Sequence, residues 1–169
     1  MLNSKITKRN VPLAFASFFL IMAIVFYIAV MNSGSKQAER IVKKLYTVSE
    51  EEPVALAASE NFSGIFREKF GKDMTKEGMQ DAIDLGFPCG LLGGDKVGKV
   101  TRAYAVRADV MKEGEEAGRQ KYDYQVEVES RYRREVEALA PTKTEMHAGR
   151  IYLKRTGILE WKVDKIEIN

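Results

Sequence analysis

The chain has 169 residues, a length that suits one domain of ordinary size, and a net charge of +3 from 27 Lys and Arg against 24 Asp and Glu. The excess lies in Lys5, Lys8 and Arg9, because residues 36–169 contain 24 basic and 24 acidic side chains. A neutral domain argues against a nucleic-acid-binding protein, whose binding domain carries a basic excess.

An uncharged run of 21 residues, Val11–Met31, follows the basic residues. As a helix it would extend roughly 31 Å, which matches the hydrocarbon thickness of a bilayer. A cleaved signal peptide is the alternative, but its apolar region is usually about 7–15 residues long. The run lacks acidic, basic and histidine residues and pairs of small residues four apart, so we predict a membrane anchor rather than an ion pathway or a close-packed helix dimer.

The flanks of this run bear on its orientation. Their cations are nearly balanced, but long domains translocate largely regardless of charge. We therefore predict a cytoplasmic basic tail over residues 1–10, a transmembrane helix over 11–31, a linker over 32–35 and an extracytoplasmic domain over 36–169. The predicted location is the cell membrane, crossed once.

Three helices are predicted at the start of this domain. Ser35 can cap the first helix, and an acidic run ending in Pro53 favours the start of the second, which Gly71 ends. The third is predicted to begin at Thr75 and to end before Gly86. The apolar residues with helical spacing are Ala38, Ile41, Val42 and Leu45 in the first, Phe62, Ile65, Phe66 and Phe70 in the second, and Met79, Ala82 and Ile83 in the third.

The hydrophobic period changes to two after a glycine-rich loop over residues 86–98. Four strands are predicted, over residues 100–110, 121–133, 144–154 and 158–168. In the last strand the apolar positions change phase, which predicts a bulge near Asp164-Lys165. Helices followed by strands indicate an α+β fold, with about three helices on a curved antiparallel sheet of about four strands.

The last strand, Leu159-Glu160-Trp161-Lys162-Val163-Asp164-Lys165-Ile166, resembles the final strand of the cystatin-like, cone-shaped nuclear transport factor two superfamily. The resemblance covers residues 36–169 and includes no catalytic motif. With a basic tail and one membrane span, the layout is also similar to the bitopic scaffold subunits of bacterial type IV secretion and conjugation machines. That resemblance implies a cone-shaped domain that contacts other envelope proteins.

The single cysteine, Cys89, and the single histidine, His147, cannot form a Cys/His zinc site within one chain. We predict no metal, no cofactor and no catalytic residue, and interpret Cys89 as a structural or incidental thiol. An intermolecular disulfide through Cys89 stays open in an oxidising compartment, as does a homo-oligomer.

Two sets of residues are candidates for binding. A small-ligand pocket or an enzyme site in the open end of the cone would use Tyr104, Tyr122, Tyr124 and Trp161, although tyrosines on an apolar strand face are more often core residues. Asp109 could join such a site, but the period-two count places it on the face opposite Tyr104. A docking patch for an acidic partner or lipid headgroups would use Arg131, Arg133 and Arg134.

These observations lead to three hypotheses about the function of the chain. The favoured one is a non-catalytic, anchored assembly protein that binds other membrane or envelope proteins. The second is an anchored ligand-binding module or enzyme. The third is a pilin-like subunit, although Asn10 rather than glycine precedes the apolar run and no glutamate occurs early in it.

Overall fold

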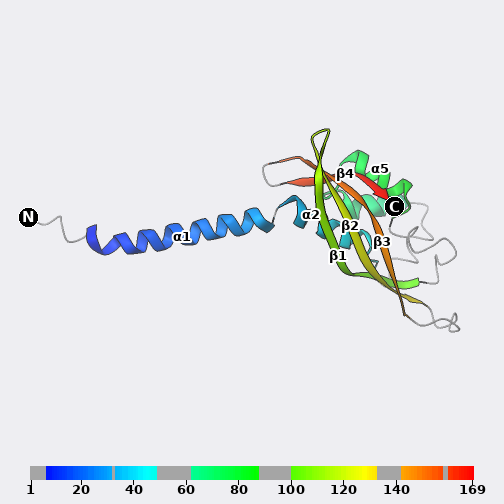
Figure 1. The fold of residues 1–169 in the computed structure, drawn as a ribbon, viewed down its shortest axis with the longest axis horizontal. Helices are drawn as coiled ribbons and strands as arrows, with labels where there is room; N and C mark the ends of the chain where they lie inside the picture. Colours follow the sequence, from blue (N-terminus) through cyan, green and yellow to red (C-terminus); the bar gives the residue numbers. More distant parts are fainter. Residues whose placement is uncertain (1–6, 32, 49–61, 88–99, 133–141, 158–159) are drawn as a thin grey trace, which may run out of the picture.

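The computed structural model describes residues 7–31, 33–48, 62–87, 100–132, 142–157 and 160–169. Four helices precede four strands along these residues (Figure 1), so the predicted α+β class is confirmed. The helices are α1 (Thr7–Met31), α2 (Gly34–Leu45), α4 (Phe62–Phe70) and α5 (Lys76–Asp84). The strands are β1 (Val100–Glu116), β2 (Arg119–Tyr132), β3 (Thr142–Arg155) and β4 (Trp161–Ile168).

The helix α1 extends away from the rest of the molecule (Figure 1). Its described side chains, those of residues 15–28, are exposed and almost all apolar. Over the residues that the structure describes, no helix combines the length and hydropathy of a membrane span.

The four strands form one antiparallel sheet in the order β1-β2-β3-β4, a meander in which each strand pairs with its neighbours in sequence. The β1–β2 hairpin turns through Ala117 and Gly118, both with positive φ, as a two-residue type I′ turn requires. Short bridges cover part of each edge strand: Val48 pairs with Ala103 of β1, and Met74 pairs with Val163 of β4. These bridges shield parts of edges that would otherwise offer unpaired backbone groups.

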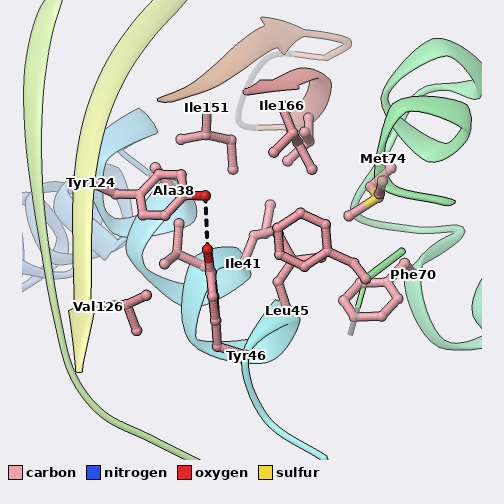
Figure 2. Close-up of a cluster of buried hydrophobic side chains, with 14 of the residues drawn as sticks. Ala38, Ile41, Leu45, Tyr46, Phe70, Met74, Tyr124, Val126, Ile151 and Ile166 are labelled. Carbon is pink, nitrogen blue, oxygen red and sulfur yellow. Dashed lines mark hydrogen bonds between the residues drawn. The ribbon is translucent and has the colours of Figure 1, made fainter. Parts of the chain in front are cut away.

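The helix α2 lies against the inner face of the sheet, and its predicted apolar residues Ala38, Ile41, Val42 and Leu45 are buried. Figure 2 shows several of them beside side chains of β2, β3 and β4. The predicted cap was wrong by two residues. Ser33 rather than Ser35 is the N-cap, because the helix already begins at Gly34 and the Ser33 hydroxyl accepts from the Lys36 amide.

The helices α4 and α5 contribute further buried residues to the core. Phe66 and Phe70 of α4 are buried and stack at 4.5 Å between ring centroids, while the predicted helix start near Pro53 lies outside the described residues. The α5 prediction is confirmed: Thr75 is the N-cap and accepts from the Gly78 amide at 3.2 Å. Gly86 follows the C-cap with φ of 74°, a conformation that glycine adopts without strain.

The predicted bulge in β4 is also confirmed. Leu153 pairs with Val163 and Tyr152 with Lys165, so Asp164 is the extra residue. Asp164 is only 2% exposed. Its Oδ1 accepts from the Thr75 hydroxyl at 2.7 Å, and its Oδ2 lies 2.5 Å from Arg119 Nε in an ion pair that lacks hydrogen-bond geometry. The bulge therefore connects β4 to the start of α5.

Candidate protein-binding surface

The inner face of the sheet is filled by the core. Tyr122 and Tyr124 point into it and are 1% and 2% exposed. The Tyr124 hydroxyl lies 3.1 Å from that of Tyr46 in a buried hydrogen bond (Figure 2), and burial raises the pKa of both groups. The Tyr122 hydroxyl donates to Gln120 Oε1 at 2.5 Å. These two tyrosines are core residues with satisfied hydroxyls.

The outer face of the sheet faces away from the helices, and a bulge in β1 decides which residues reach it. Ala105 pairs with Val128 and Arg107 with Glu127, so Val106 is an extra residue. The period-two count fails there, and Tyr104 and Asp109 lie on the same, outer face instead of on opposite faces. Tyr104 pairs with Glu129 and lies under the Arg102 guanidinium at 5.3 Å. Its hydrogen bond with Glu129 raises the pKa of Tyr104.

Trp161 lies apart from these tyrosines. It is half-buried against the core and lines a hollow of about 700 Å³ between α2 and α4, together with Arg40, Lys44 and Lys72. Tyr124 borders a different hollow. The structure therefore does not bring Tyr104, Tyr122, Tyr124 and Trp161 together around one ligand within the described residues.

Of the predicted basic patch, the structure describes Arg131 alone, because Arg133 and Arg134 lie outside the described residues. Arg131 is exposed on the outer face, opposite Arg102 on the neighbouring strand, and its Nε lies 4.0 Å from Glu129. Beyond Phe87, the glycine-rich loop, with Cys89, also lies outside the described residues. The rings of His147 and Tyr46 lie 5.3 Å apart between centroids, with their planes tilted by 34°.

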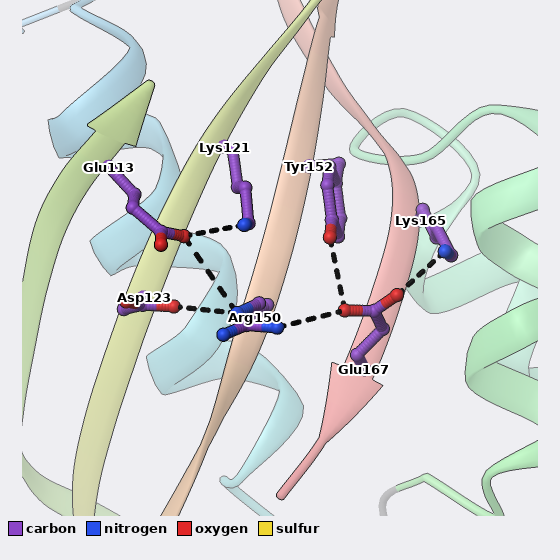
Figure 3. Close-up of polar contacts among 7 residues, drawn as sticks. All are labelled: Glu113, Lys121, Asp123, Arg150, Tyr152, Lys165 and Glu167. Carbon is purple, nitrogen blue, oxygen red and sulfur yellow. Dashed lines mark hydrogen bonds and ion pairs between the residues drawn. The ribbon is translucent and has the colours of Figure 1, made fainter. Parts of the chain in front are cut away.

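Sequence reasoning missed a network of ion pairs across the outer face, in which Arg150 of β3 is central (Figure 3). Arg150 Nε lies 3.0 Å from Asp123 and 3.8 Å from Glu113, and its Nη1 lies 3.9 Å from Glu167. Glu113 also pairs with Lys121 at 2.8 Å. Strand pairing creates this network, because it aligns Asp123 of β2 with Arg150 of β3 and Glu167 of β4.

The network continues along β4. Glu167 accepts from Tyr152 at 3.0 Å and pairs with Lys165 at 2.6 Å (Figure 3). The Lys165 ammonium lowers the pKa of Glu167, and the carboxylate in turn raises the pKa of Lys165. Hydrogen bonding to Asp123 likewise raises the pKa of Arg150.

Beside the network lies a shallow hollow of about 450 Å³ whose lining includes Asp109, Met111, Gln125 and Asn169. Three exposed apolar side chains lie on the same face: Val106, Met111 and Met146 are 51%, 69% and 64% exposed. Methionine and arginine are among the residue types that are enriched in protein–protein interfaces, which makes this face a candidate protein-binding surface. The described residues contain no group of three His, Cys, Asp or Glu placed to hold a metal ion.

Comparison with known proteins gives structural neighbours only. No family model matches the sequence, and no curated protein matches it. The fold is similar to the periplasmic domain of DotI, with 14% identity and a TM-score of 0.48 over 80% of this chain and 91% of that one. It is also similar to a periplasmic fragment of TraM, with 11% identity and a TM-score of 0.48 over 79% of this chain and 92% of the other.

Proposed function

We propose that this chain is a non-catalytic, single-pass membrane protein whose domain, residues 36–169, binds other envelope proteins outside the cytoplasm. In this proposal residues 11–31 are the anchor and the outer sheet face is the binding surface. The layout of the sequence extends the proposal to a scaffold subunit of a conjugative type IV secretion machine.

The exposed apolar surface of α1 is the observation that carries the proposal. Eleven large apolar side chains between Phe15 and Ile28 are 41–72% exposed. Removing one such side chain from water is worth about 1.5–3 kcal/mol, so a helix of this composition is far more stable in lipid than in water. The uncharged run Val11–Met31 extends this surface at both ends.

The outer face supports the partner-binding half of the proposal. It carries the cations Arg102, Arg107, Lys121, Arg131, Arg150 and Lys165 and the acids Asp109, Glu113, Asp123, Glu127, Glu129 and Glu167. Since many of these charges pair with one another, this face would select partners by shape and local pairing rather than by overall charge. The inner face is occupied by the core, which favours a binding role for the outer face over a ligand site inside the cone.

Site-specific photocrosslinking in native membranes tests the proposal. A benzophenone amino acid at exposed Met111 or Met146 should give discrete crosslinks to other envelope proteins, identified by mass spectrometry. The same residue at Lys76, which is exposed on the helical side, is the matched control and should not give them. Recovery of an uncrosslinked chain from all three positions would contradict partner binding by this face.

A further inference from the structure

The described residues of the β3–β4 turn, 154–157 and 160–162, lie at the end of the domain that adjoins α1. The helix α2 begins at Gly34, three residues after α1 ends, and a Cβ on Gly34 would meet the side chains of Tyr122 and Gln120. Those residues follow Arg119, at the start of β2. Since Arg119 pairs with Lys154 and Lys154 with Lys162, the ends of β2, β3 and β4 meet there. In Figure 1 the end of β3 and the start of β4 point back toward α1.

Cations are concentrated on this turn. Lys154 and Lys162 lie directly opposite each other, with Arg119 on the next strand, an arrangement that is unfavourable between like charges. Asp164 forms an ion pair with Arg119, and Glu160 forms one with Lys162. For exposed Lys154 no ion pair is found among the described residues. The nearby acids Glu115 and Glu116 lie across the sheet on β1.

The adjacent pair, Arg155 and Trp161, combines a cation with an aromatic ring. The two residues are cross-strand partners, and the Arg155 guanidinium lies 5.8 Å from the centre of the indole ring. Arg155 is exposed, donates to the Gly157 carbonyl at 3.1 Å, and is therefore held at the turn. Tryptophan beside lysine and arginine is the composition that favours the headgroup layer of a membrane.

We propose that Lys154, Arg155 and Trp161 contact the anionic headgroups of the membrane in which α1 is anchored. This inference rests on the proposed anchoring. The short connection agrees with it, since the three residues from Met31 to Gly34 reach at most about 11 Å even when fully extended, which keeps this end of the domain close to a headgroup layer about 5–7 Å deep. The contact would orient the domain, with the β3–β4 turn toward the bilayer and the outer face toward partners at its side.

The test uses Trp161 as a reporter, because it is the only tryptophan in the chain. The full chain is reconstituted in nanodiscs of phosphatidylcholine alone or with phosphatidylglycerol, and the tryptophan emission is recorded with and without headgroup-labelled quencher lipid. We expect a blue shift and stronger quenching with phosphatidylglycerol, both reversed by high salt. Lys154→Gln/Arg155→Gln should lose both effects, and Lys154→Arg/Arg155→Lys should keep them.

The controls separate the sources of failure. Lys143→Gln removes an exposed cation from the far end of β3 and should leave the shift intact. Inorganic phosphate added to phosphatidylcholine discs should have no effect; a shift there would overturn the lipid as the ligand. If the chain does not insert into nanodiscs, the proposed anchoring by α1 is wrong. If it inserts but its tryptophan emission is the same with and without phosphatidylglycerol, only the proposed headgroup contact is wrong.

Discussion

Thr75 and Asp164 are 89 residues apart in sequence, yet the Thr75 hydroxyl donates to Asp164 Oδ1 at 2.7 Å while accepting from the Gly78 amide. One hydroxyl thus caps α5 and satisfies a buried carboxylate in the β4 bulge. Two features predicted separately, the cap of a helix and the bulge of a strand, form one contact in the folded domain.

Asp164→Ala is therefore expected to destabilise the domain. The substitution removes a charge-assisted hydrogen bond, leaves Arg119 without its buried partner and relaxes the cap. We expect a loss of about 2–3 kcal/mol in the free energy of unfolding, measured by urea denaturation. Glu160→Ala, at an exposed neighbour, is the control and should stay within about 0.5 kcal/mol of wild type; equal effects of the two substitutions would argue against the bridging role.

Gly78 illustrates how closely α5 approaches β4. A Cβ at this position would collide with the backbone carbonyl of Val163. Glycine to alanine usually stabilises a helix by up to about 1 kcal/mol, but here we expect Gly78→Ala to lower stability by about 1–3 kcal/mol through overpacking. Gly114→Ala, where a Cβ meets nothing within 4 Å, provides the comparison in thermal unfolding and should be close to neutral.

Sequence reasoning found the elements and failed where a single residue changed the phase. Apolar spacing predicted α2, α5 and the core faces, because those helices bury whole stripes. The count along β1 placed Tyr104 and Asp109 on opposite faces, which was wrong, since a bulge at Val106 adds one residue between them. The bulge at Asp164 could be predicted because apolar residues flank it on both sides. Beyond Val106 the alternation is less regular, because apolar Met111 is exposed and the small residue Ala108 is buried. The Arg150 network could not be predicted, because it depends on the register of three strands.

The buried pair Tyr46 and Tyr124 gives the domain a predictable dependence on alkaline pH. Burial, the largest cause, raises the pKa of each hydroxyl above the ordinary value of 10. Between that value and the folded pKa the unfolded chain loses protons that the folded chain keeps, so stability should fall as pH rises above about 10. Tyr46→Phe/Tyr124→Phe should flatten that part of the curve, measured by urea denaturation at each pH; an unchanged slope would contradict the assignment.

The two tyrosines also make a clean double-mutant cycle. Either single phenylalanine variant leaves one buried hydroxyl without its partner at 3.1 Å, and we expect each to cost about 1–2 kcal/mol. The double variant removes both polar groups at once and should cost less than the sum. Simple additivity of the two costs would show that the hydroxyls do not depend on each other.

Glu167 reports on the outer-face network. Its pKa is lowered chiefly by the hydrogen bond from Lys165, with smaller contributions from Tyr152 and Arg150. We expect Lys165→Gln to raise the pKa of Glu167 toward its ordinary value of 4.5, and Arg150→Gln to raise it less, as measured by NMR titration of the side-chain carboxyl. Because the side chain is about one-third exposed, the stability change should be under about 1 kcal/mol.

The orientation proposed for the chain predicts which residues react with a membrane-impermeant thiol reagent in intact cells. Single cysteines are placed at Ser4, in the basic tail, and at Gly114, where the sheet surface is open to an added side chain, both in a Cys89→Ser background. With the tail in the cytoplasm and the domain outside, we expect labelling at position 114 in intact cells. Position 4 should be labelled only after the membrane is permeabilised. Labelling of position 4 but not of position 114 in intact cells would reverse the topology, and with it the site of the headgroup contact.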